Sequence, residues 1–192
     1  RNRLINGSMR TDQRNSGAAQ TFTAAAAIAY CVDRWYGACT GANVNGQRVA
    51  GAGAYQYLYQ FTGAASVTQV LLGQRIEATN IYDLVGTTAT LSAMISSSTL
   101  TSITWTAYYP TVADTFTTKT QIATGTFTIN STLTRYSAQI ALGANVDKGL
   151  AIEFTTGAFT SGTLKIGGVQ LEPGSAVTDF EVVAVDDEMF RC

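Results

Sequence analysis

The sequence predicts an all-β protein, built as one antiparallel β-sandwich or jelly roll. From about residue 69 onward, apolar and polar side chains alternate with a period of two, which is typical of strands with one buried face. Turn signals such as "NG" at 45–46, "VGTT" at 85–88 and "TSG" at 160–162 separate these stretches at short intervals, as in sandwiches. A length of 192 residues suits one large β domain.

The chain divides into three parts. We expect residues 1–30 to form an N-terminal arm and the first strand, 31–181 the sandwich, and 182–192 a C-terminal tail. The arm is polar and basic and is expected to cross or cap the sandwich. Within it, "AAQTFTAAAAIA" at 18–29 has enough alanine for a helix, but its threonines make a loop an equal alternative. The tail includes "DDE" at 186–188, predicted to be solvated, and is interpreted as the start of a truncated downstream segment.

The segment "YCVDRWYGAC" at 30–39 contains two of the three cysteines. If it is one strand, Cys31 and Cys39 are separated by roughly 26 Å, whereas a disulfide needs Cα atoms about 5 to 6 Å apart. A bridge would require a hairpin, and the segment carries no hairpin signal. We therefore expect free, buried thiols at these positions.

The stretch "GAYQYLYQF" at 53–61 places aromatic residues at every second position. Phe61 continues the parity of the three tyrosines, so this side is predicted to face the core. Gln56 and Gln60 lie on the other side, which is predicted to face solvent. Because amides form hydrogen bonds with sugar hydroxyls, both glutamines are candidate ligand-binding residues.

The stretch "SITWTAYYP" at 102–110 shows the same alternation. Parity predicts that Trp105 faces the core together with Ile103 and Ala107, while Tyr108 points outward near a strand end. Tyr108 is therefore the aromatic candidate for ligand contact, with Tyr109 and Trp105 as neighbouring candidates.

Two short segments predict local irregularities. In "ATNIYDLVG" at 78–86 we expect one short turn of helix. In "TLKIGGVQL" at 163–171 the apolar parity changes across Gly167 and Gly168, which is typical of a β-bulge. The bulge should keep the apolar residues on both sides of it facing the core.

The composition excludes several functions. Only 13% of the residues are charged, against roughly 25% in ordinary globular proteins, and no basic run exists that would neutralise nucleic-acid phosphates. No apolar stretch approaches the length of a membrane span. Histidine is absent, which removes the commonest general base and metal ligand. No two carboxylates have a spacing that implies the close pair of a glycosidase, so we expect no enzyme activity.

Four motifs together resemble a family of bacteriophage tail-fibre and virion proteins, in which they occur in the same order. They are "NRLINGSMRTDQRN" at 2–15, "VDRW" at 32–35, "GQRIEATNIYDL" at 73–84 and "GGVQLEPGSAVTDFE" at 167–181. The resemblance implies a component of an extracellular virion and, since fibres are typically trimers, a homotrimer.

The pattern is also similar to that of jelly-roll carbohydrate-binding modules, through "INGSM", Trp35, "ATLSAM", "LTRYSAQI" and "GGVQLE". This similarity implies two antiparallel sheets with one concave, sugar-binding face. Several such modules bind a structural calcium through acidic residues near both ends. Here Ser8, Arg10, Gly167 and Gly168 occupy those places. Because calcium needs carboxylates among its ligands, it is poorly supported, and no cofactor is expected.

Together, the two resemblances imply a fibre or spike module that binds host cell-surface carbohydrate during phage attachment. The candidate binding residues are Tyr108, Gln56, Gln60, Tyr109 and Trp105. The alternative is a structural or trimerising knob or spacer without a ligand of its own. Exposed aromatic residues on the concave face would favour the first function, and a large apolar subunit interface the second.

Overall fold

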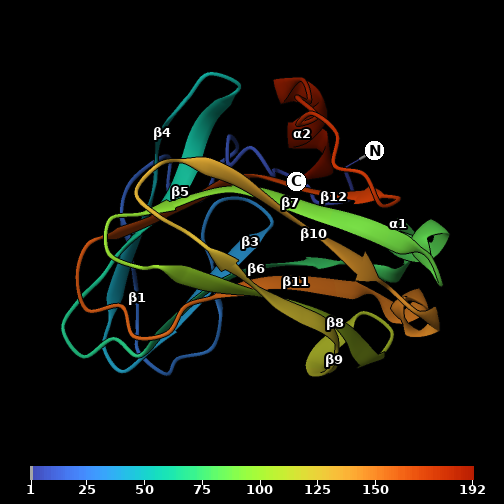
Figure 1. The fold of residues 1–192 in the computed structure, drawn as a ribbon, viewed down its shortest axis with the longest axis horizontal. Helices are drawn as coiled ribbons and strands as arrows, with labels where there is room; N and C mark the ends of the chain where they lie inside the picture. The colour runs from blue at the N-terminus through green and yellow to red at the C-terminus, as the bar shows by residue number, and fades with distance from the viewer. Residues whose placement is uncertain (1) are drawn as a thin grey trace.

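The computed structural model describes residues 2–192, which form two antiparallel sheets packed face to face (Figure 1). Within these residues each sheet has six strands. Sheet A has the order β1 (Gln20–Phe22), β4 (Val44–Ala52), β5 (Tyr55–Thr62), β12 (Thr163–Pro173), β7 (Thr88–Ser97) and β10 (Thr134–Ala141). Sheet B has the order β2 (Ala29–Tyr30), β3 (Trp35–Thr40), β6 (Gln69–Ile76), β11 (Leu150–Thr155), β8 (Ser102–Val112) and β9 (Thr115–Thr128). The predicted all-β sandwich is confirmed.

The helical segments are short and lie outside the two sheets. They are α1 (Ala78–Ile81), the 3-10 turns η1 (Tyr82–Leu84) and η2 (Ala144–Lys148), and α2 (Val185–Arg191). The first two confirm the expected helical turn in "ATNIYDLVG". Within residues 2–192, none of the helices has the length and apolar character needed to cross a bilayer.

Side chains from the inner faces of both sheets fill the core. Strand alternation places Leu91 and Ile95 of β7 and Ile152 and Phe154 of β11 in one buried cluster, as the period of two predicts. Trp105 belongs to the same cluster. Its ring packs over Gly125, where an added Cβ would lie 2.7 Å from the indole.

The predicted β-bulge in β12 is confirmed. The register against β7 shifts between Gly167 and Gln170, while the apolar residues on both sides, Leu164, Ile166, Val169 and Leu171, are all buried. Gly168 has a φ of +52°, a conformation that favours glycine.

Beyond the bulge, the N-terminal arm takes the place of β5 beside β12. The Val169 N–H donates to the carbonyl of Gly7 at 2.9 Å, and the Arg3 N–H donates to the carbonyl of Leu171 at 2.8 Å. The arm therefore completes the hydrogen bonding of sheet A at this edge.

Asn6 joins the arm to three other parts of the fold. Its buried side-chain amide donates to the carbonyls of Thr11 (2.8 Å) and Asp33 (3.0 Å), and its Oδ1 accepts the Thr11 N–H at 3.0 Å. Its own carbonyl accepts a hydrogen bond from the Trp35 indole at 3.0 Å. Its N–H donates to the carboxylate of Glu188 in α2. With a φ of +54°, Asn6 adopts the left-handed conformation that asparagine tolerates better than most residues.

The segment "YCVDRWYGAC" contains a hairpin, which sequence inspection did not predict. Strands β2 and β3 pair antiparallel, with Tyr30 opposite Tyr36, and the turn between them includes Arg34 at a φ of +71°. Arginine gives no sequence signal for this left-handed conformation. The cysteines are nevertheless free, with Cys31 and Cys39 both buried, as expected, and burial raises the pKa of the Cys31 thiol to about 12.

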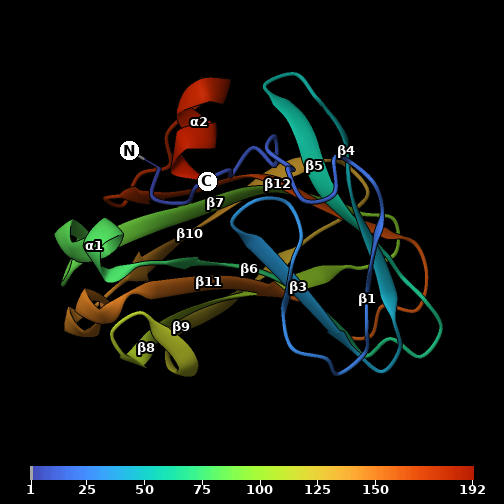
Figure 2. The same ribbon diagram turned by 180° about the vertical axis from the view of Figure 1, so that it is seen from behind.

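The two terminal segments lie together on the outer side of sheet A (Figures 1 and 2). The prediction of a solvated "DDE" is wrong for Glu188, which is 5% exposed because α2 docks it against Asn6. Asp186 and Asp187 are exposed as expected. In the segment 18–29 the chain forms β1 and β2 with irregular backbone between them, so the loop alternative describes it better than a helix.

Replacing Asn6 should destabilise the whole sandwich. The change Asn6→Ala removes three hydrogen bonds, two of them buried, and takes away the side-chain partner of the Thr11 N–H and of the Asp33 carbonyl. We expect a loss of about 3 kcal/mol, which corresponds to a fall of about 6–12 °C in melting temperature for a chain of this size. Thermal unfolding followed by circular dichroism measures this.

The matched control is Asn45→Ala, which removes one exposed hydrogen bond to Thr21. It should change stability by less than about 0.5 kcal/mol. If the two variants lowered the melting temperature equally, the hydrogen bonds of Asn6 would not be a main source of the stability of the sandwich.

Candidate functional site

The predicted site residues lie on both sheets. Tyr108 is on the outer face of β8 in sheet B, whereas Gln56 and Gln60 are on β5 in sheet A. The exposed Gln56 accepts a hydrogen bond from Arg10 at 3.1 Å. The structure therefore does not bring the two glutamines and Tyr108 together into one site.

The other two candidates on β8, Trp105 and Tyr109, have the parity of the inward-facing residues. Trp105 is 6% exposed and lies in the core, as its parity predicts. Tyr109 is half-buried near the end of the strand, where Lys148 Nζ lies 5.8 Å from the centre of its ring. Neither side chain contributes to the outer face of sheet B.

Terminal segments cover a large part of the outer face of sheet A. Gln139 of β10 donates to the carbonyl of Ser175 at 2.7 Å, and Arg135 donates to that of Thr178 at 2.6 Å. Gln170 of β12 accepts the N–H of Glu181 at 2.9 Å. Helix α2 lies on this side, and neither α1 nor α2 lies over the outer face of sheet B (Figure 1).

The outer face of sheet B carries a row of side chains from five neighbouring strands. Strand pairing aligns Tyr36 with Gly73, Gly73 with Glu153, Glu153 with Thr106, and Thr106 with Thr124. Directly paired residues point to the same side of a sheet. A parallel row beside it aligns Arg75, Ala151 and Tyr108.

Glu153 is the acceptor at the centre of this row. Its carboxylate is 4% exposed, accepts a hydrogen bond from the Tyr36 hydroxyl at 2.9 Å, and forms an ion pair with Lys119. Burial raises the pKa of the Tyr36 hydroxyl, and the charge of Glu153 raises it further. Tyr36 therefore remains a hydrogen-bond donor to Glu153.

The ring of Tyr36 lies close against the sheet because its partner on the neighbouring strand β6 is Gly73, which has no side chain. A Cβ at Gly73 would be 2.8 Å from that ring, closer than side-chain contacts allow. Gly73 therefore sets the position from which Tyr36 reaches Glu153.

Two cations lie over aromatic rings on the same face. The Arg75 guanidinium carbon is 5.1 Å from the ring centre of Tyr36 and 5.2 Å from that of Phe116. Lys119 Nζ is 4.3 Å from the ring centre of Tyr108. These cation–π contacts help to hold both cations in place on this face.

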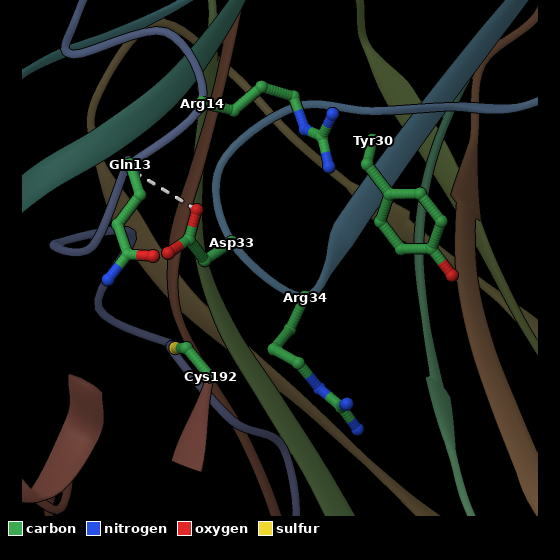
Figure 3. Close-up of a pocket in the computed structure, with 6 residues that line it drawn as sticks. All are labelled: Gln13, Arg14, Tyr30, Asp33, Arg34 and Cys192. Atoms are coloured by element: carbon green, nitrogen blue, oxygen red, sulfur yellow. Dashed lines mark hydrogen bonds between the residues drawn. The ribbon is translucent and has the colours of Figure 1, made fainter. Parts of the chain in front are cut away.

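Two hollows adjoin at the end of this face and share Tyr30 and Arg34. The smaller, of about 200 Å³, is lined by Tyr30, Arg34, Arg75, Glu77, Asp114 and Phe116. The larger, of about 530 Å³, is lined by Gln13, Arg14, Tyr30, Asp33, Arg34 and Cys192. In Figure 3 the Arg14 side chain extends toward Tyr30, and the dashed line marks the hydrogen bond from the Gln13 N–H to Asp33.

Arg34 lies at the boundary between the two hollows. Its guanidinium binds both carboxylate oxygens of Glu77, at 2.7 and 2.8 Å. Burial acts to raise the pKa of Glu77, but hydrogen bonds from Arg34 and the charge of Arg34 outweigh it, so this pKa lies below its usual value. Tyr30, 41% exposed, packs edge-on against Tyr36 with 6.0 Å between ring centres.

Among residues 2–192, no group of three or more histidine, cysteine, aspartate or glutamate side chains is placed to hold a metal ion. The centre of the face is an acceptor surrounded by donors, which suits hydrogen bonding to a neutral or anionic polar molecule.

Sequence reasoning missed Tyr36, Arg75, Glu153 and Lys119. One signal was present, since Glu153 is the charged residue on the outward side of the apolar stretch "LAIEF". The pairing of β3 with β6, and of β6 with β11, joins segments distant in the chain. Alternation within one strand does not predict such neighbours.

Solved structures show what this chain is similar to. A family 4 carbohydrate-binding module matches with a TM-score of 0.55 and 16% identity, over 88% of this chain and 98% of that one. TmCBM61, solved with β-1,4-galactotriose, matches with a TM-score of 0.51 and 12% identity, over 91% of this chain and 99% of that one. The chain therefore has the sandwich fold of carbohydrate-binding modules.

A phage protein has a similar domain. Tailspike protein 4 of bacteriophage CBA120, in its enzymatically active part, matches with a TM-score of 0.55 and 12% identity, over 74% of this chain and 20% of that one. No protein-family profile and no curated protein sequence matches the chain.

The Arg34–Glu77 ion pair should make stability depend on pH in a defined direction. Because the folded pKa of Glu77 is lowered, its contribution is present above the unfolded carboxyl pKa and is lost as pH falls through the folded value. Glu77 is 40% exposed, so Glu77→Gln should cost only about 0.5 kcal/mol at pH 7, or about 1–2 °C in melting temperature. Calorimetry at pH 7 and pH 3 should show this difference vanishing at pH 3.

The control is Asp147→Asn, an exposed carboxylate without an ion-pair partner among residues 2–192. It should leave the melting temperature at pH 7 unchanged. A Glu77→Gln difference that persists at pH 3 would show that the effect is not due to the charge pair.

Proposed function

We propose that this chain is a non-catalytic carbohydrate-binding module and that the outer face of sheet B holds the sugar. The observation that carries the proposal is the cluster at Glu153, where a fixed acceptor lies among fixed donors on a face that neither α1 nor α2 covers. The similarity in fold to carbohydrate-binding modules supports it. One fold can serve several functions, so the chemistry of this face, and not the fold alone, decides what the chain binds.

The face has the chemistry that sugars require. Lys119, held in place by Glu153, can donate a hydrogen bond to a sugar hydroxyl, and the hydroxyl of Thr124, which donates to the carbonyl of Trp105 at 2.9 Å, can accept one. Tyr108 and Tyr30 lie at its margins and offer ring surface to the apolar side of a sugar ring. Of the predicted candidates, the proposal keeps Tyr108.

We further propose that the module belongs to a phage fibre or spike and binds a host cell-surface glycan. The four virion-protein motifs and the similarity to a domain of a phage tailspike support this. A homotrimer would present three weak sites together and raise avidity without new contacts.

A structural role as a trimerising knob or spacer is the second candidate. Apolar side chains near the C-terminus are exposed, with Phe190 at 90%, Val182 at 61% and Met189 at 47%. Such residues suit a subunit contact, and a contact of this kind does not need a glycan.

The two sheets give the test a matched pair of variants. On a glycan array, Tyr108→Ala should weaken binding about tenfold or more. The change removes ring surface that can contact the sugar, and it removes the ring over which Lys119 lies. Gln60→Ala, on the outer side of sheet A, should leave binding unchanged, as should Gln56→Ala. Circular dichroism of each variant confirms that the fold survives.

Loss of binding in the glutamine variants alone would place the ligand on sheet A and contradict the proposed face. A blank array from a well-folded trimer would favour the structural role instead.

A further inference from the structure

Arg75 is a fixed cation without a carboxylate partner. It lies between the rings of Tyr36 and Phe116 and lines the smaller hollow. Among residues 2–192, the ion pairs are those of Arg3, Arg34, Arg48 and Lys119, and none includes Arg75.

The carboxylates around Arg75 are engaged elsewhere. Glu77 binds Arg34 with both oxygens, Asp114 accepts the N–H of Ala78 at 2.8 Å, and Glu153 is paired with Lys119 and Tyr36. A guanidinium that is half-buried, packed against two rings and without an ion pair among the described residues is suited to an external anion at this hollow. Its planar fork matches a carboxylate in particular.

We infer that the glycan bound by this face is acidic and that Arg75 binds its carboxylate; this inference rests on the proposed function. The hollow at Arg75 lies beside the face at Glu153. Glu153 pairs with Gly73 of β6, and Arg75 lies two residues further along β6, so both side chains are on the same face of sheet B. A sugar residue over Glu153 and Thr106 thus has the guanidinium beside it, where the carboxylate of a uronic or sialic acid can reach.

A second cation, Arg14, could bind an anion in the same way. Arg14 lines the larger hollow with Tyr30 and Arg34 and has no carboxylate partner among the described residues. The two hollows meet at Tyr30 and Arg34. Two such cations along adjoining hollows suit a polysaccharide that carries carboxylates on more than one residue.

The test uses an array of acidic oligosaccharides, including trigalacturonate, glucuronate-containing trisaccharides and 3′-sialyllactose, each beside its carboxyl-reduced neutral counterpart. The wild-type chain should bind at least one acidic member roughly tenfold to hundredfold more tightly than its reduced partner, the range expected for a charge-assisted hydrogen bond. Arg75→Gln should remove this preference and bind both members equally. The control Lys165→Gln neutralises a cation on sheet A, away from this face, and should keep the preference.

The outcomes separate the two proposals. If the wild-type chain binds acidic and reduced members equally, the inference of an acidic ligand is wrong, while the proposal of carbohydrate binding still holds. A preference that survives in Arg75→Gln would overturn the role of Arg75. If the folded wild-type chain binds no member of either kind, both the proposed function and this inference fail.

Discussion

The buried amide of Asn6 is the interaction on which the rest of the structure depends. It holds the carbonyl of Asp33 in the β2–β3 turn, while its backbone binds Trp35 of the core and Glu188 of α2. The same turn contains Arg34 and follows Tyr30, the two residues shared by the hollows. A contact between the chain ends and one turn therefore also positions the edge of the candidate binding face.

The sandwich was predictable because alternation and turn signals are local. The parity of Trp105, the bulge at Gly167 and Gly168, and the helical turn after Glu77 each depend on a few consecutive residues. The β2–β3 hairpin was not predictable, since its turn places an arginine at positive φ without glycine or proline. Nor was the burial of Glu188, whose partner Asn6 lies at the other end of the chain.

The candidate site was predictable only in part, because a binding face is defined by strand pairing. Tyr108 lies on the proposed face, but its partners come from β3, β6, β11 and β9, and their order is a tertiary property. The same ordering places Gln56 and Gln60 on the other sheet. Fixed polar groups at Glu153, Tyr36 and Lys119 lower the entropy lost when a ligand binds, which is why the face is a better candidate than scattered exposed residues.

The central claim is that the outer face of sheet B is the ligand-binding face. The most direct measurement is a titration of the isotope-labelled chain with an oligosaccharide that binds it, followed by backbone amide NMR. The account predicts that the largest shift changes cluster at Tyr36, Gly73, Arg75, Thr106 and Glu153, which share this face. Changes centred on β4 and β5, with these five residues unaffected, would place the ligand on sheet A and contradict the account.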